Sequence, residues 1–278
     1  MRGLGAGASP AISVVMPAYN AASYLSVAVD SILAQSFRDF ELIVVDDAST
    51  DHTWEVLAPY LKADARVKAL RNTANAKISR TLNRGIEAAA GRYVMRMDAD
   101  DWSYPDRLEK QFEFMESRPG VVLSGGTIEL CDENLSPLNK RRYPRTDTEI
   151  RERIFFFSPF CHPAIICRSD ALRKAGGYNE SLEVAQDYDL YFRIGRLGEL
   201  ANMDDCIHRL RTHRGSSSIR RGALQERNTL YIRLKAIVEY GYEMDRSARL
   251  YLAIQYLSSF LIPFRMKFWL FNLLRRSE

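Results

Sequence analysis

The sequence lacks the features by which several classes of protein are recognised. Its four cysteines include no Cys-x-x-Cys pair, so neither a zinc ribbon nor a thiol redox motif is expected. Four cysteines in 278 residues do not suggest a disulfide framework, and a reducing compartment is the simpler interpretation. The net charge of +4 forms no basic stripe before the C-terminus, which argues against nucleic acid as a partner.

The chain also has no apolar run of the ~20 residues that a bilayer-spanning helix needs. Residues 1–10 are rich in Gly and Ala without an apolar centre, so they are interpreted as a disordered lead-in and not as a signal peptide. Near the C-terminus, Pro263, Arg265 and Lys267 interrupt the apolar runs. A cytoplasmic protein is therefore expected, and its 46% apolar composition suffices for a substantial core.

Residues 12–123 alternate between short β-branched apolar runs and segments with helical spacing. The runs predict buried strands at 12–16, 41–45, 67–70, 93–97 and 121–123, and the spaced segments predict helices at 24–34, 54–61, 78–90 and 103–115. Pro17 is expected to end the first strand, Pro59 to kink or end the second helix, and residues 103–106 to cap the fourth. This alternation predicts an α/β fold with a mostly parallel sheet and helices on both faces.

The second half of the chain is less regular. We expect a surface loop, a short strand, a helix and a helical C-terminal region at 130–147, 164–167, 187–197 and 224–278. Asp189 and Arg193 are four residues apart on the predicted helix and are expected to pair. His162 is expected to make a structural hydrogen bond, and His52 and His208 to lie at the surface. The predicted organisation is a lead-in at 1–10, one domain at 11–220 with halves 11–125 and 126–220, and a helical region at 221–278.

Polar residues follow three of the predicted strands. They are Pro17-Ala18-Tyr19-Asn20, Asp46-Asp47-Ala48-Ser49-Thr50-Asp51 and Asp98-Ala99-Asp100-Asp101. Ligands of parallel sheets bind beyond the carboxyl ends of the strands, so these groups are expected to form one site. Tyr19 offers a ring face for stacking. Capping of the next helix needs only Asp51, which leaves Asp46 and Asp47 to accept hydrogen bonds from a base or a ribose.

The third of these groups carries three acids in four residues. Asp98, Asp100 and Asp101 repel one another, and a hard divalent cation such as Mg²⁺ or Mn²⁺ would relieve the repulsion. In an extended chain, alternate spacing would put Asp98 and Asp100 on the same side. A solvated acidic loop is the alternative for such a cluster in isolation. The shared position at strand ends favours the metal site.

Four blocks together resemble family-2 glycosyltransferases of the GT-A fold, over roughly residues 11 to 215. The blocks are residues 12–20, 44–51, 83–87, and 98–101 with Pro105 and Arg107. Residues 160–163, 175–178 and 186–190 resemble the acceptor-side block of that family, although Gln186 stands where glutamate is usual. Residues 211–216 resemble the block that closes over the diphosphate.

The resemblance implies an inverting transferase that moves a sugar from a nucleotide-sugar donor, most often a UDP-sugar, to an acceptor hydroxyl in bacterial cell-surface polysaccharide or glycolipid synthesis. It also assigns roles to individual residues. It implies that Asp100 is the metal ligand and Asp187 the general base. It implies diphosphate contacts from Arg211 and His213. The nucleotide contacts that it implies come from Pro17, Ala18, Tyr19, Asp47, Lys77 and Asp98.

Two questions stay open at this level. Residues 249–276 mix Phe, Trp and Leu with Lys and Arg. This mixture suits either a helix lying on a membrane, which a lipid-linked acceptor would favour, or a helix packed on the domain or on a second copy. The alternative functions are a nucleotidyltransferase and a non-catalytic nucleotide-sugar-binding relative. Residues 17–23 lack the glycine-rich basic loop of the first, and the presence of both Asp100 and Asp187 argues against the second.

Overall fold

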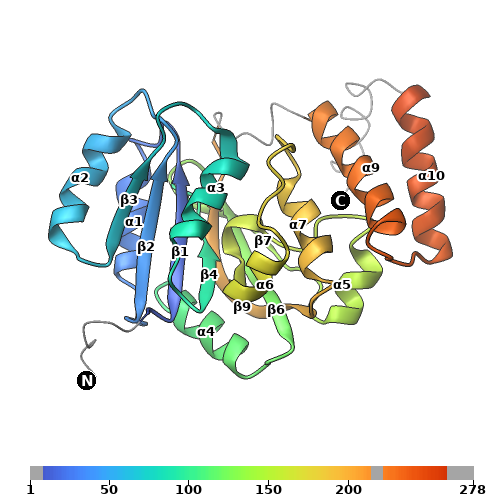
Figure 1. Ribbon diagram of the computed structural model, residues 1–278, viewed down its shortest axis with the longest axis horizontal. Coiled ribbons are helices and arrows are strands. Elements are labelled where there is room, and N and C mark those ends of the chain that lie inside the picture. Colours follow the sequence, from blue (N-terminus) through green and yellow to red (C-terminus); the bar gives the residue numbers. More distant parts are fainter. Residues whose placement is uncertain (1–8, 214–221, 262–278) are drawn as a thin grey trace.

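The computed structural model describes residues 9–213 and 222–261 (Figure 1). Its strands are β1 (Ile12–Ala18), β2 (Phe40–Asp46), β3 (Val67–Arg71), β4 (Tyr93–Arg96), β5 (Trp102–Ser103), β6 (Val121–Cys131), β7 (Pro137–Arg141), β8 (Ile166–Arg168) and β9 (Glu199–Arg211). Its helices are α1 (Leu25–Leu33), α2 (Thr53–Ala63), α3 (Lys77–Ala88), α4 (Arg107–Glu116), α5 (Asp147–Arg153), the 3₁₀ turn η1 (His162–Ala164), α6 (Ser169–Lys174), α7 (Gln186–Ile194), α9 (Gly222–Val238) and α10 (Arg246–Leu261).

The described strands form one sheet in the order β3-β2-β1-β4-β8-β6-β9-β5, with β7 paired to β6. The first four strands of this order run parallel, as the βα alternation predicts. β8 is antiparallel to both β4 and β6, and β6 runs parallel to β9. The sheet is therefore parallel in its first half and mixed in its second, which confirms the α/β fold class.

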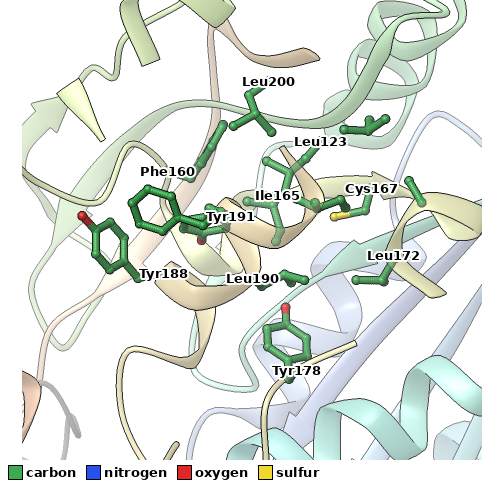
Figure 2. Packing of buried hydrophobic residues seen from close by; sticks show 14 of the residues in the cluster. Leu123, Phe160, Ile165, Cys167, Leu172, Tyr178, Tyr188, Leu190, Tyr191 and Leu200 are labelled. Carbon is green, nitrogen blue, oxygen red and sulfur yellow. The ribbon is translucent and has the colours of Figure 1, made fainter. Parts of the chain in front are cut away.

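Side chains of alternate strand residues enter two separate cores, one on each face of the sheet. Val14 and Met16 of β1 pack with α1, α2 and α4, whereas Val15 packs with α3 and α7 on the other face. The core that contains Val15 continues into α5, α9 and α10. Figure 2 shows its centre, where Tyr178 and Leu190 lie near Leu172 and Cys167. This core fixes α3 and α7 beside the carboxyl end of β4.

Several local expectations for the first half were wrong. Pro17 does not end β1, which continues to Ala18, because a proline at this register leaves the flanking ladder bonds intact. Of the two outcomes expected at Pro59, a kink or an end of the helix, the second is wrong, because α2 runs on to Ala63. The fourth helix begins at Arg107, not near Ser103, and no side chain caps it. Residues 102–103 instead form the short strand β5 against β9.

The second half is more regular than its sequence indicates. β6 extends to Cys131 and pairs with β7, so much of the expected loop at 130–147 is a hairpin. The long strand β9 was also missed, because its polar residues hide the alternation. The expected ion pair between Asp189 and Arg193 is present at 2.8 Å.

The C-terminal helices α9 and α10 pack on each other, and α9 packs on α7. Within the described residues, none of the helices has the length and apolarity that a membrane crossing requires. The sequence beyond Leu261, which includes most of the predicted interfacial stretch, lies outside the described residues.

Candidate active site

The ends of β1 and β2 meet, as expected of neighbouring parallel strands. The Asp47 amide donates to the carbonyl oxygen of Ala18 over 2.8 Å. Pro17 and Ala18 are buried, whereas Tyr19 is 51% exposed and leaves its ring face open. Asp46 is fully buried and forms an ion pair with Arg71. Asp47 is also buried, at 4% exposure, but its carboxylate is directed at the loop that leads into α3.

Asp47 organises the loop that leads into α3. Its Oδ1 accepts hydrogen bonds from the Asn72 side chain at 2.6 Å and from the Ala76 amide at 2.7 Å. Its Oδ2 accepts from the Lys77 amide at 3.1 Å. A carboxylate oxygen has two acceptor positions, so Oδ2 retains capacity for one more donor. The exposed residue Lys77 is thereby held next to Asp47.

Four non-glycine residues around these loops have a left-handed backbone. Their φ angles are 51° at Asn20, 57° at Ala48, 71° at Lys77 and 61° at Ala185. Such conformations each cost of order 1–3 kcal/mol and persist only where surrounding contacts enforce them. At Asn20, such contacts come from its amide, which donates to the Ser49 hydroxyl, and from its side-chain oxygen, which accepts from the Thr50 amide. Asn20 and Ala48 directly follow Tyr19 and Asp47, Lys77 is itself a predicted site residue, and Ala185 lies two residues before Asp187.

The third acidic group follows β4 in a turn. Residues 99–100 turn, and the Asp101 amide approaches the Asp98 carbonyl oxygen at 3.4 Å. The extended geometry expected to align Asp98 with Asp100 is therefore wrong. The turn still gathers the acids, because one carboxylate oxygen from each of Asp98, Asp100 and Asp101 lies within 4.8 Å of the others.

Asp98 is paired with a cation from its own strand. Arg96 lies 2.5 Å from it, and the guanidinium group is almost wholly buried. Two of its nitrogens, Nε and Nη1, have no hydrogen-bond partner among the described residues. The sequence analysis missed Arg96, although a charged residue between Met95 and Met97 in an apolar strand was a visible signal.

Asp100 faces His213, whose Nε2 lies 2.9 Å from Asp100 Oδ2. Burial, and next the negative charge of Asp101, raise the pKa of Asp100. A carboxylate whose charge is disfavoured in this way gains most from a nearby cation. The carboxylate oxygens of this acidic turn are the ligand type that suits Mn²⁺ or Mg²⁺. The residues present therefore fit a divalent metal.

Asp101 stabilises the turn through contacts of its side chain with β9. Its Oδ1 accepts from the Arg211 amide at 2.8 Å, and its Oδ2 lies 2.8 Å from His208 Nε2. The other ring nitrogen of His208 lies 3.1 Å from Arg107 Nη1. An arginine can only donate, so His208 Nδ1 accepts and Nε2 carries the proton donated to Asp101. Burial lowers the pKa of His208, which keeps this ring neutral.

The prediction that His208 lies at the surface was wrong, because its side chain is completely buried. The cause is its position on β9, opposite Ser103 of β5. Arg107 is equally buried and donates to the backbone oxygens of Arg96 and Pro163. Its place in the sequence block 98–107 was noted, but nothing in the sequence indicated that it reaches His208.

Arg211 also holds the acidic turn. Its Nε donates to the Asp100 carbonyl oxygen at 2.5 Å, and its Nη1 donates to the carbonyl oxygen of Glu133. The guanidinium group stacks on the Tyr24 ring with 4.7 Å between the guanidinium carbon and the ring centroid. These contacts make it a support of the turn. Of the two residues predicted to contact a diphosphate, His213 is the one directed at an acidic side chain.

Asp187 lies in the first turn of α7, where the helix dipole favours a negative charge. Burial raises the pKa of its carboxyl group, and the positive charge of Arg96 acts in the opposite direction. Burial raises the pKa of the Tyr178 hydroxyl, and the charges of Asp187 and Asp98 add smaller contributions in the same direction. Tyr178 is hydrogen-bonded to His162 at 2.7 Å, which confirms the structural bond expected for that histidine.

Arg96 therefore connects the two sides of the site. It touches Asp98 at the end of β4, and its charge reaches Asp187 at the start of α7. The site combines a strained loop with an open tyrosine ring, a group of acids that fits a metal, and a separate buried carboxylate. Such a combination is typical of enzymes that bind a charged donor and remove a proton from a second substrate.

Comparison with known proteins identifies the family. The model of glycosyl transferase family 2 matches residues 13–176. A glycosyltransferase of Haemophilus influenzae is 30% identical over 75% of this chain and 68% of its own length. The O-antigen biosynthesis glycosyltransferase WbnJ of Escherichia coli is 32% identical over 74% of this chain and 81% of its own. This chain belongs to glycosyl transferase family 2 and is a glycosyltransferase.

Solved structures of low identity share the fold. TarS of S. aureus in complex with UDP has a TM-score of 0.67 at 18% identity, covering 91% of this chain and 72% of its own. The mannosyltransferase PcManGT of Pyrobaculum calidifontis, in complex with GDP-Man and Mn²⁺, has a TM-score of 0.66 at 18% identity, covering 92% and 70%. These likenesses confirm the expected GT-A fold.

Proposed function

We propose that this chain transfers a sugar from a nucleoside-diphosphate donor to an acceptor hydroxyl, with inversion at the anomeric carbon, in the synthesis of a bacterial cell-surface polysaccharide or glycolipid. The observation that carries the proposal is the placement of Asp187 in the first turn of α7, within electrostatic reach of the Arg96 that pairs with Asp98. One acid group serves the donor and another serves the acceptor. The name of WbnJ, an O-antigen biosynthesis enzyme, supports the polymer class.

The donor nucleotide occupies the ends of β1 and β2. The exposed ring of Tyr19 stacks on the base, and the free acceptor position of Asp47 Oδ2 takes an N–H from it. Lys77, at the start of α3, contacts the diphosphate. A UDP-sugar is the first donor to test, because the similar TarS structure holds UDP. GDP-Man in PcManGT makes a guanosine donor the alternative.

Asp98 has a different role from Asp47. Its side chain is about a third exposed, and Arg96 holds one of its oxygens. The other oxygen accepts hydrogen bonds from hydroxyl groups of the ribose or of the donor sugar. A residue that contacts the sugar in this way fixes the orientation of the anomeric carbon relative to Asp187.

The diphosphate lies at the acidic turn. Asp100 and His213 are the residues that would hold a divalent metal, either Mn²⁺ or Mg²⁺. When bound, such a metal supplies Lewis-acid stabilisation of the negative charge that builds on the leaving phosphate. Asp101, His208 and Arg211 keep the turn in shape from beneath.

Asp187 acts on the acceptor. Its carboxylate takes the proton of the attacking hydroxyl as that oxygen bonds to the anomeric carbon. Burial raises the pKa of Asp187 and makes it a better base, while Arg96 keeps it ionised. Attack from the face opposite the diphosphate inverts the anomeric centre. The negative potential of Asp98 and Asp100 lies on the donor side, so the two halves of the reaction use separate carboxylates.

Family membership decides against the nucleotidyltransferase considered from the sequence. A non-catalytic relative is the second candidate, and an activity assay separates it from the first. Transfer of labelled sugar from a panel of UDP- and GDP-sugars with Mn²⁺ tests the proposal, and the product's anomeric proton coupling reports inversion. Nucleotide binding without hydrolysis or transfer across the panel would favour the non-catalytic relative.

A further inference from the structure

The outer face of α10 is apolar. Ala248 and Leu252 are buried against the rest of the molecule. Leu250, Ile254 and Leu257, on the opposite side of the helix, are 63%, 57% and 58% exposed. Residues at i, i+4 and i+7 share one face of a helix, so these three form a continuous exposed stripe.

Helix α9 carries a second stripe of the same kind. Tyr231, Leu234 and Val238 are exposed, whereas Ile232 and Ala236 are buried. The two helices pack on each other at the edge of the molecule (Figure 1). Single exposed apolar residues are ordinary, but a group of them at one place marks an interaction surface. We name the six exposed residues of α9 and α10 the apolar stripes.

The charged residues of α10 are positive. Arg246 and Arg249 are exposed, and α10 contains no acid. The acids Glu239, Glu243 and Asp245 lie at the connection between the two helices, and α9 carries Glu226 together with three basic residues. An amphipathic helix with exposed Leu and Ile, basic neighbours and few acids suits a surface of anionic lipid. A second copy of this chain would bring the same positive charge and be repelled.

We propose that the outer faces of α9 and α10 bind an anionic lipid surface. Leu250, Ile254 and Leu257 enter the boundary between headgroups and acyl chains. Arg246 and Arg249, both exposed on α10, pair with lipid phosphates. The surface lies on these helices and does not overlap the nucleotide-binding loops of β1 and β2.

The same helices are bonded to the segment that carries Asp187. Asn228 of α9 donates to the Val184 carbonyl oxygen over 3.1 Å. Arg233, buried without an acidic partner in the described residues, donates to the Tyr188 hydroxyl over 3.0 Å. A lipid surface on α9 and α10 thus lies on the acceptor side. This placement favours an acceptor with a lipid carrier, an inference that rests on the proposed function. Binding of the lipid surface by α9 and α10 does not depend on transferase activity.

Co-sedimentation of the full chain with vesicles tests the proposal. The probes are vesicles of phosphatidylcholine alone and of phosphatidylcholine with phosphatidylglycerol. The test variant carries Leu250→Gln, Ile254→Gln and Leu257→Gln, and the matched control carries Leu138→Gln and Leu197→Gln at exposed positions elsewhere. We expect wild type and control to bind the anionic vesicles. The triple variant should bind them at least roughly tenfold more weakly.

Circular dichroism and nucleotide binding check that the triple variant folds, so a loss of vesicle binding is attributed to the surface. Wild type that fails to bind anionic vesicles, or a triple variant that binds like wild type, would overturn the proposal. Light scattering tests the alternative that a second copy of this chain binds the apolar stripes. A wild-type dimer that the triple variant converts to a monomer would assign the stripes to a second copy and also overturn it.

Discussion

At the scale of single residues, Arg96 sets the charge balance of the site. It is a buried cation beside Asp98 and within electrostatic reach of Asp187. In its proposed role as a base, Asp187 must be ionised; burial raises its pKa, and the positive charge of Arg96 acts to lower it. We therefore expect Arg96→Met to raise the pKa of Asp187 and to move the acidic limb of the kcat–pH profile to higher pH. Steady-state transfer rates across pH measure the shift.

Arg96→Lys is the control for this prediction, because it restores a positive charge without the planar group. The acidic limb should return most of the way to its wild-type position. A profile whose acidic limb stays in place in the Met variant, with kcat merely lowered, would assign Arg96 a purely structural role.

Arg107 has a role in stability. It is fully buried and donates to Arg96 and Pro163 backbone oxygens and to His208. Arg107→Met leaves these acceptors without a donor, and each buried unsatisfied group costs about 1–3 kcal/mol. We expect the free energy of unfolding to fall by about 3–5 kcal/mol. Urea denaturation measures it, with exposed Arg80→Met as a control that should change little.

From the sequence, the candidate site residues that could be named are those that follow a strand or match a motif, such as Asp47, Asp100 and Asp187, and their roles stay predictions. The sequence did not predict Arg96 or His208 as part of the site. Their roles depend on long-range contacts, because Arg107 reaches His208 from 101 residues away in the chain. His208 also sits among polar residues of β9, so its sequence surroundings resemble a surface.

At the scale of elements, the close packing of α3 on the sheet depends on Gly85. A Cβ atom there would lie 2.4 Å from Val15 Cγ1 and 3.2 Å from Val45 Cγ2. Gly85→Ala therefore pushes α3 away from β1 and moves Lys77 at its start. Overpacking of this kind costs about 1–3 kcal/mol. We expect a lower melting temperature and weaker UDP binding, measured by calorimetry.

The compensating change Val15→Ala removes the atom that clashes. In the double variant, UDP affinity should recover even though the core loses contacts. A Gly85→Ala protein with wild-type stability and affinity would show that α3 is not tightly held by this contact.

Elements were predictable where one pattern repeats. The βα units of the first half have the period and length that a parallel sheet requires, and their strands lie within a few residues of the predicted positions. The errors fall where tertiary contacts outweigh local preference. β7 is exposed at all five positions and forms only because β6 is beside it. β5 is two residues long and depends on β9.

At the scale of the whole molecule, the acidic turn predicts that donor and metal bind together. Asp100 and His213 fit a metal by themselves only weakly, because they provide two ligands. A diphosphate adds oxygen ligands. We expect Mn²⁺ to tighten UDP binding in wild type and to have little effect in Asp100→Asn, as measured by titration calorimetry. Equal tightening in both proteins would exclude Asp100 as a ligand.

The division of labour between Asp187 and the donor-side acids is the central claim, and one measurement tests it most directly. The rate of labelled-sugar transfer is compared between wild type and Asp187→Asn at matched donor saturation, after calorimetry shows equal UDP affinity. Removal of a general base typically lowers the rate 10²–10⁴-fold, so a loss of about that size is expected. Transfer at the wild-type rate by Asp187→Asn would contradict the account.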